Sequence, residues 1–238
     1  MRINLTVTEV VYDTETGAMA GPSDIELVTI EGQTYLIVAG EAEGGLTSFL
    51  ISADGSLSLA SEVLPNAGSG TLGLRDITVG QNNAEVFLFT GAMADNNQVR
   101  YTIGADGGLT VGESYSDAAG TYAQWDVVQM VSTDSATYLY ASIWGQPGLL
   151  RFELDVNNLL TGGTYFPDNA DIYLGDVTAI HGAKLHGQDF LFIASGIDAG
   201  MQSYRVLPDG SLDLIDTVAP AEGGISGATE IVSAEVDG

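Results

Sequence analysis

Five carboxylates at similar points of a repeated pattern are the residues of this 238-residue sequence best placed to do chemistry. Each stands just ahead of a segment rich in branched apolar residues: Asp24, Asp76, Asp126, Asp176 and Glu230. Carboxylates repeated around an axis could bind Ca²⁺, which takes about six to eight oxygen ligands. Calcium is therefore the cofactor that the pattern suggests. The interpretation we favour is structural, because a feature of every repeat usually serves the repeat, here by accepting hydrogen bonds from backbone amides between repeats.

Two further candidates depart from the repeat. His181, His186 and Asp189 carry the donor atoms of a transition-metal site. However, residues on either side of a hairpin turn often point away from one another, so we favour an ordinary surface hairpin. Trp144, in a Trp-Gly-Gln-Pro-Gly stretch, could stack on a sugar ring and is a candidate ligand-binding residue, with packing as the favoured alternative.

Several catalytic motifs are missing from the sequence. There is no G-x-S-x-G elbow, no H-E-x-x-H pair, no glycine-rich phosphate loop and no EF-hand calcium loop. With two histidines in the whole chain, a Ser-His-Asp triad has little support. No catalytic residue can be assigned, and we expect a non-enzyme rather than an enzyme. An enzyme would have to be a hydrolase that uses carboxylates or a metal.

The elements that position these residues follow from an internal repeat of about 52 residues. The apolar triplets that begin at Tyr35, Phe87, Tyr138 and Phe190 recur along the chain, as do a second aromatic and a leucine after a turn. Asp54-Gly55, Asp106-Gly107, Asn157-Asn158 and Asp209-Gly210 supply the turns, since these residues tolerate the positive φ of tight hairpins. Each repeat therefore predicts four antiparallel strands, which is the blade of a β-propeller.

The predicted fold is all-β, with four complete blades over residues 24–66, 76–117, 126–168 and 178–219. Residues 1–16 resemble the last strand of a blade, and residues 229–238 resemble the first, so they form a partial blade. We expect one propeller domain over 1–238. Since the repeat does not divide the chain evenly, we expect a portion of a larger ring of six to eight blades. An irregular five-bladed ring, or a dimer that shares blades, is the alternative.

The charge excludes some partners. Thirty-two acidic residues against 6 basic ones give a formal charge of −26, which repels nucleic acid and anionic membranes. No segment is apolar for long enough to suggest membrane insertion. The chain has no cysteine, so the redox compartment cannot be inferred.

The blade pattern resembles two families of known propellers. The stretch Gly32 to Gly40, followed by Leu46 to Phe49 and Asp54 to Leu57, is similar to the blades of 6-phosphogluconolactonase-like propellers. In composition, and in the stretch from Leu5 to Asp24, the chain resembles the N-terminal propeller region of acidic secreted calcium-binding proteins of the repeats-in-toxin kind. That resemblance implies a bacterial protein exported by type I secretion. The calcium-binding nonapeptide repeats of that group do not occur in this chain.

These observations predict a non-catalytic binding or scaffold module of an extracellular protein, with a protein or glycan ligand. Two alternatives are left open. One is a lactonase-like hydrolase that acts at the mouth of the central channel. The other is an assembly module that self-associates through exposed strand edges.

Overall fold

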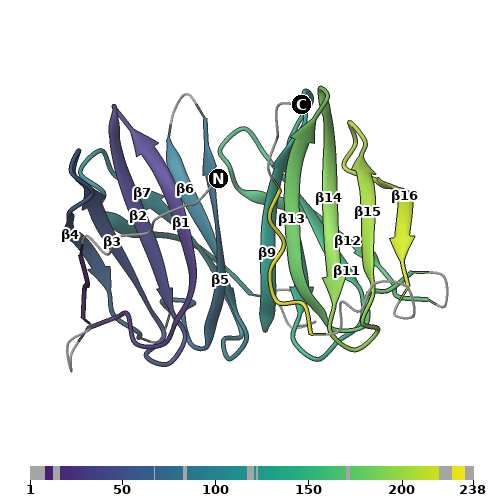
Figure 1. Cartoon of the computed structure of the whole chain (residues 1–238), viewed down its shortest axis with the longest axis horizontal. Helices are drawn as coiled ribbons and strands as arrows, with labels where there is room; N and C mark the ends of the chain where they lie inside the picture. Colours follow the sequence, from purple (N-terminus) through teal and green to yellow (C-terminus); the bar gives the residue numbers. More distant parts are fainter. Residues whose placement is uncertain are drawn as a thin grey trace, which may run out of the picture. The chain divides into compact units, whose positions relative to one another are not determined.

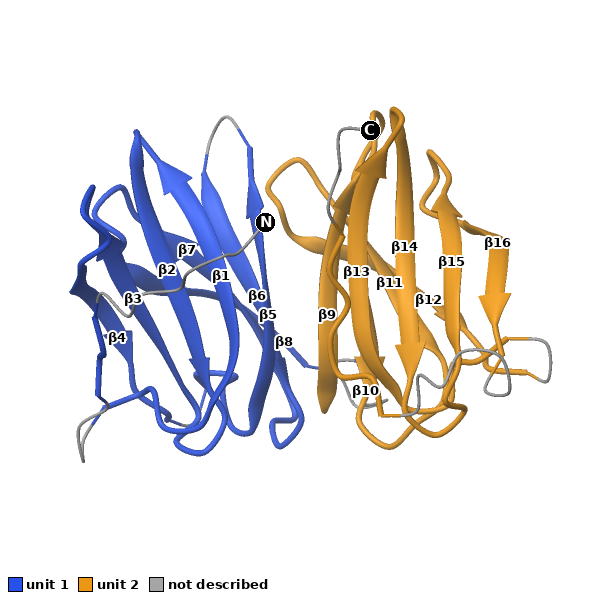
Figure 2. Cartoon of the chain, in the orientation of Figure 1, with its two compact units in different colours: residues 1–122 blue, residues 123–238 orange. Residues whose placement is uncertain are grey.

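The computed structural model describes residues 9–12, 17–66, 68–82, 85–116, 121, 123–169, 172–219 and 227–233. Within these ranges the chain forms strands, turns and loops, and none of them contains a helix long and apolar enough to cross a membrane. The strands lie in two compact units, residues 1–122 and 123–238 (Figure 2). Each unit holds two sheets of four antiparallel strands.

The first unit contains blades 1 and 2 (Figure 1). Blade 1 consists of β1 (Pro22–Ile30), β2 (Gln33–Gly40), β3 (Gly45–Ile51) and β4 (Leu57–Val63). Blade 2 consists of β5 (Leu74–Gln81), β6 (Val86–Ala92), β7 (Gln98–Ile103) and β8 (Leu109–Tyr115). Within each blade every strand pairs with the next one along the chain, so the blades are simple meanders.

The second unit repeats this arrangement. Blade 3 consists of β9 (Trp125–Ser132), β10 (Thr137–Ile143), β11 (Leu149–Leu154) and β12 (Leu160–Phe166). Blade 4 consists of β13 (Val177–Leu185), β14 (Gln188–Ser195), β15 (Met201–Val206) and β16 (Leu212–Val218). The predicted all-β fold of four-stranded antiparallel blades is confirmed.

Burial is greatest in the second and third strands of each blade and low in the fourth, and in blade 1 the first strand is also largely exposed. The second strand of each blade is almost wholly apolar, and in β6 every residue is buried. The fourth strand alternates or is exposed throughout its middle, as in β8. Each unit has its own core between its two blades, one around Ile37 and Leu88 and the other around Tyr140 and Leu191. The second and third strands therefore carry most of the packing energy, while the fourth strands face water.

Tyrosines in the second strands link neighbouring blades within each unit. The Tyr35 hydroxyl donates to the Ala105 carbonyl at 2.9 Å, and Tyr138 donates to the Pro208 carbonyl at 2.9 Å. Each acceptor belongs to the last hairpin turn of the following blade. Two separate columns of the repeat, the aromatic triplet and the Asp-Gly turn, are thus in direct contact in space.

The ends of the chain extend the pattern of the blades. The Leu57 amide donates to the Glu9 carboxylate at 2.5 Å, and one repeat later the Leu109 amide donates to the Ser61 hydroxyl at 3.1 Å. Glu9 therefore lies, relative to blade 1, where Ser61 lies relative to blade 2. Beside blade 4, the Thr178 hydroxyl donates to the Ala228 carbonyl at 2.6 Å. The rest of the predicted partial blade, residues 1–8, 13–16 and 234–238, lies outside the described residues.

Candidate active site

The first strands of the four blades, β1, β5, β9 and β13, are called the inner strands. Each of them begins after a residue in the left-handed conformation. These residues are Gly21, Gly73, Gln124 and Asp176, with φ between 57° and 65°. Each carbonyl accepts a backbone N–H from the end of the second strand of its blade, and the donors are Glu41, Met93, Trp144 and Gly196. The same turn therefore fixes the start of every inner strand, where the predicted carboxylates lie.

The structure does not place these carboxylates at equivalent positions. Asp24 and Asp76 are equivalent, since they lie opposite Ala39 and Gly91 just after an irregularity in the strand pairing. Asp126 falls inside the corresponding irregularity of β9, and Asp176 is the left-handed residue itself. The pattern that looked like one repeated feature thus contains three different positions. In the described part of the chain, no group of three or more acidic or histidine residues could hold a metal ion.

Asp24 and Asp76 form a close pair in the first unit. The Ile77 amide donates to Oδ2 of Asp24 at 3.0 Å and to Oδ1 of Asp76 at 3.1 Å. Because both oxygens contact one nitrogen, they lie no more than about 6 Å apart. Both side chains are half-buried. The Asp24 contact crosses from blade 1 to blade 2, so it also holds two inner strands together, which agrees with the structural interpretation.

One cation lies beside this pair. Arg75 precedes Asp76 and approaches the Glu41 carboxylate at 3.9 Å, with both side chains partly exposed. The Ser23 hydroxyl donates to the Leu74 carbonyl at 2.9 Å and gives a second link between the two inner strands. The start of β1 and β5 therefore gathers two carboxylates, an ion pair and a hydroxyl on a frame fixed by hydrogen bonds.

The remaining candidates lie in the second unit. Asp126 is 3% exposed, Asp176 is half-buried, and Glu230 is exposed in the segment that follows blade 4. The Ser142 hydroxyl accepts the Val127 amide at 3.1 Å and donates to the Val177 carbonyl at 3.5 Å. Ser142 thus links β9 to β13, as Ser23 links β1 to β5.

The two histidines and Asp189 do not come together. His181 Nε2 lies 2.8 Å from the Ser233 hydroxyl, whereas Asp189 forms an ion pair with Lys184 at 3.3 Å. His186 has a φ of 51° in the exposed turn between β13 and β14. The three side chains serve different local contacts, as expected of a surface hairpin.

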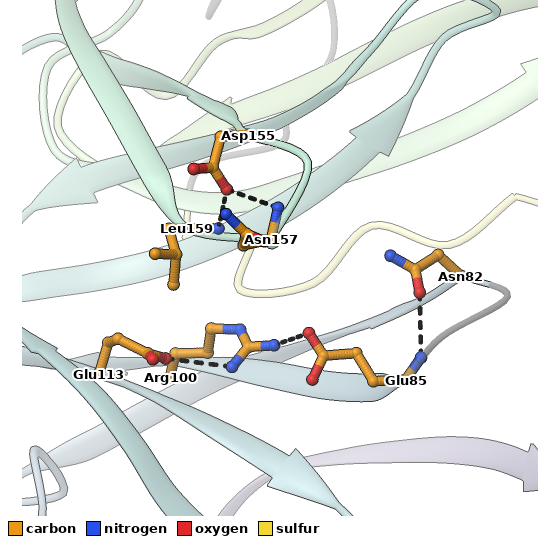
Figure 3. A network of polar contacts seen from close by, with 7 residues as sticks. All are labelled: Asn82, Glu85, Arg100, Glu113, Asp155, Asn157 and Leu159. Carbon is orange, nitrogen blue, oxygen red and sulfur yellow. Dashed lines mark hydrogen bonds and ion pairs between the residues drawn. The ribbon is translucent and has the colours of Figure 1, made fainter.

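Arg100 is the most buried cation described. Its guanidinium donates to the Glu85 carboxylate and to the Glu113 carboxylate, the latter at 3.1 Å, and lies 4.9 Å from the centre of the Phe87 ring (Figure 3). All of these residues belong to blade 2, so the ion pairs of Arg100 lie within one blade. In the second unit, the Asp155 carboxylate accepts the amides of Asn157 and Leu159 (Figure 3). These hydrogen bonds hold the Asn157-Asn158 turn, which stands where the other repeats have Asp-Gly.

Sequence reasoning missed the hydroxyls of Ser23, Ser142 and Thr178 and the left-handed Gln124. Glycine favours a positive φ, so Gly21 and Gly73 could have indicated the turn, whereas glutamine at position 124 does not. A hollow of about 490 Å³ in the first unit is lined by Gly32 to Thr34 and Leu50 to Ala53. It lies at the turn between β1 and β2, at the opposite end of β1 from Asp24, and no ionisable side chain lines it. It is therefore not the candidate site.

Comparison with solved structures identifies the fold class. The chain is similar to an exo-β-1,3-galactanase from Phanerochaete chrysosporium solved with galactose, at a TM-score of 0.60 and 14% identity, over 90% of this chain and 54% of that one. The chain is also similar to a family 43 glycoside hydrolase from Xanthomonas citri, at a TM-score of 0.59 and 14% identity, over 85% of this chain and 76% of that one. A family 43 β-1,3-galactosidase solved with galactodeoxynojirimycin is similar at a TM-score of 0.59 and 12% identity, over 89% of this chain and 80% of that one. These enzymes are five-bladed β-propellers, so the comparison supports a β-propeller fold for this chain.

The chain spans about half the length of the galactanase that it resembles. A scan of protein-family models and a search of curated proteins both give no match. At this level of identity the likeness establishes the propeller fold. The number of blades in the ring of this protein stays a prediction.

Three functional expectations need correction. A non-catalytic binding or scaffold module, a lactonase-like hydrolase and an assembly module are contradicted, because the similar propellers are glycoside hydrolases. The resemblances to repeats-in-toxin proteins and to lactonase-like propellers are likewise not supported beyond the propeller itself. The solved galactanase structures contain galactose or a galactotriose, which is consistent with the glycan among the predicted ligands, whereas nothing supports the predicted protein ligand or self-association.

Proposed function

We propose that this chain is a glycosidase-like propeller that hydrolyses glycosidic bonds with the carboxyl groups of Asp24 and Asp76. One observation carries the proposal: two half-buried carboxylates from neighbouring inner strands converge on the Ile77 amide. Glycoside hydrolysis generally uses two carboxyl groups on either side of the scissile bond, about 5 to 9.5 Å apart. The similarity to family 43 enzymes supports the same reaction class.

The chemistry assigned to the pair is acid and base catalysis. One carboxyl group gives its proton to the glycosidic oxygen as the bond from that oxygen to the anomeric carbon breaks. The other, as a carboxylate, takes a proton from the attacking water or attacks the anomeric carbon itself. The shared amide and the Ser23 link hold both strands in register, so the carboxyl separation is fixed before substrate binds.

The test is hydrolysis of a panel of neutral oligosaccharides that includes β-1,3-galactotriose. Hydrolysis is measured as the release of reducing ends. We expect Asp24→Asn and Asp76→Asn each to lower the rate at least 100-fold, since general acid or base catalysis contributes about 10²- to 10⁴-fold. Asp106→Asn is the matched control. It removes one charge from the same unit, and asparagine can still accept the Gly108 amide. No hydrolysis of any substrate, or hydrolysis that survives both substitutions, would contradict the proposal.

Calcium binding and export by type I secretion stay predictions. Calcium binding bears on the proposal, since a cation bound near Asp24 and Asp76 would compete with their acid and base chemistry. Hydrolysis that is unchanged by EDTA would show that the reaction does not depend on calcium.

A further inference from the structure

Blade 3 differs from the other blades at the loop that follows its second strand. The residue that donates its N–H to the left-handed residue is Glu41 in blade 1, Met93 in blade 2, Trp144 in blade 3 and Gly196 in blade 4. One backbone position therefore carries four different residue types, and one of them is a tryptophan. Because the repeat accounts for the backbone contact but not for the side chain, the side chain is open to a specific use.

The loop that carries Trp144 is fixed along its length. The Trp144 amide donates to the Gln124 carbonyl at 2.8 Å, the Gln146 amide to the Ile143 carbonyl at 3.0 Å, and the Gly148 amide to the Leu174 carbonyl at 2.8 Å. The Tyr165 hydroxyl donates to the Pro147 carbonyl. A rigid loop loses little conformational entropy when a ligand binds to it.

Two aromatic side chains of this loop region remain exposed to water. Trp144 is 45% exposed and Tyr165 is 50% exposed, although both are large enough to bury more than 150 Å². The Tyr165 ring covers Gly148, where a Cβ atom would lie 2.5 Å from its hydroxyl oxygen. The exposed amide side chain of Gln146 follows Trp144 in the same loop. An exposed aromatic ring and an exposed amide group two residues apart in one loop are a combination suited to a ring that is apolar on one face and carries hydroxyls at its edge.

We infer that Trp144 is the stacking platform of a glycan subsite for neutral hexopyranose units in the second unit. The inference rests on the proposed function in that it takes the ligand to be a glycan. Trp144 lies at the same end of blade 3 as the buried Asp126, since Trp125 pairs with Ile143. The net charge of −26 disfavours uronic acids and sulfated sugars, so the subsite takes neutral sugars.

Tryptophan fluorescence tests the subsite without any assay of hydrolysis. The chain has two tryptophans: Trp125 is fully buried against Phe152, with ring centres 5.3 Å apart, and Trp144 is exposed. Acrylamide in solution should therefore quench mainly Trp144. We expect β-1,3-galactotriose to lower the quenching constant in a saturable way, and an oligogalacturonate of the same length to leave it unchanged.

Substitutions separate stacking from folding. Titration calorimetry with β-1,3-galactotriose should show that Trp144→Ala weakens binding at least tenfold, while Trp144→Tyr, which keeps an aromatic face, stays within about threefold of the wild type. Tyr12→Ala is the control, because Tyr12 is 82% exposed and lies in the first unit. Circular dichroism checks that each variant is folded.

The outcomes distinguish this inference from the proposed function. Protection of Trp144 by galactotriose in a chain that hydrolyses nothing would support the subsite and refute the hydrolase. Hydrolysis by the wild type together with an unchanged affinity of Trp144→Ala for β-1,3-galactotriose would support the hydrolase and overturn the subsite. Unchanged acrylamide quenching across the whole panel of neutral oligosaccharides would also overturn the subsite.

Discussion

At the scale of single residues, the aspartates of two hairpin turns are held by the serine two positions later. Asp209 Oδ1 accepts the Ser211 hydroxyl at 2.6 Å and the Ser211 amide at 3.0 Å. Asp54 and Ser56 form the same pair of contacts in blade 1. These hydrogen bonds favour the ionised carboxylate, and the Ser211 hydroxyl is the main reason that the pKa of Asp209 lies below 3.8.

The lowered pKa of Asp209 gives the first residue-scale prediction. A carboxyl whose pKa falls on folding contributes stability above its unfolded pKa, and this stability is lost as the pH falls through the folded pKa. Ser211→Ala should therefore raise the pKa of Asp209 toward 3.8 and make the turn less sensitive to acid. A carboxyl NMR titration measures the shift. Asp54 in the same variant is the internal control, and an unchanged Asp209 pKa would refute the role of the hydroxyl.

The carboxylates at the starts of the inner strands show where residue-level reasoning succeeds and fails. The sequence correctly placed Asp24 and Asp76 one residue before the isoleucine column, and they lie at equivalent positions. It grouped Asp126 and Asp176 with them, although each lies one or more residues further upstream. These four carboxylates follow one another at steps of 52, 50 and 50 residues, whereas the aromatic triplets step by 52, 51 and 52, so the spacing itself could have separated the two groups. The convergence on the Ile77 amide depends on contact between blades and could not be read from one repeat.

At the scale of elements, the joint between two blades is a tyrosine ring packed on a turn glycine. A Cβ atom at Gly210 would lie 2.6 Å from the Tyr138 ring, and one at Gly107 would lie 2.4 Å from the Tyr35 ring. The turn must therefore be glycine both for its positive φ and for its fit against the ring. The Tyr140 hydroxyl adds a bond to the Gly210 carbonyl at 2.7 Å, and burial raises the pKa of this phenol, which favours the protonated donor.

This joint predicts unequal effects for two similar substitutions in the second unit. Gly210 and Gly187 have φ values of 72° and 76°, but a Cβ atom at Gly187 would meet nothing within 4 Å. Alanine should strain the backbone equally at both sites. Gly210→Ala should cost about 1–3 kcal/mol more than Gly187→Ala in the free energy of unfolding, because it also overpacks the joint. Urea unfolding measures the difference, and equal costs would show that the ring moves aside without penalty.

The elements were the most predictable level of this protein. Turn residues, alternating strands and repeated aromatic columns were sufficient to predict four blades of four antiparallel strands. The contacts between columns were not predictable, since Tyr35 and Ala105 lie 70 residues apart and belong to different repeats. The ion pairs of Arg100 with Glu85 and Glu113 were not predictable for a similar reason, since they depend on strand register within blade 2.

At the scale of the whole molecule, charge is the dominant property. Thirty-two acidic residues face 6 basic ones, and the ion pairs of Arg205 and Lys184 are solvent-exposed, so they add little stability. Mutual repulsion of carboxylates should therefore destabilise the folded chain at neutral pH. This repulsion also explains why a neutral ligand suits the proposed subsite better than an anionic one.

Salt should consequently stabilise this protein at pH 7. Raising NaCl from about 0.05 to about 0.5 M shortens the Debye length from about 14 to about 4 Å and screens the repulsion between surface carboxylates, so Tm should rise by several degrees. Differential scanning calorimetry measures the shift. The control is the same salt series near pH 4.1, the isoelectric point of the sequence, where the net charge and therefore the screening effect should vanish. An equal rise at both pH values would mean that salt acts through hydration of apolar surface rather than through charge.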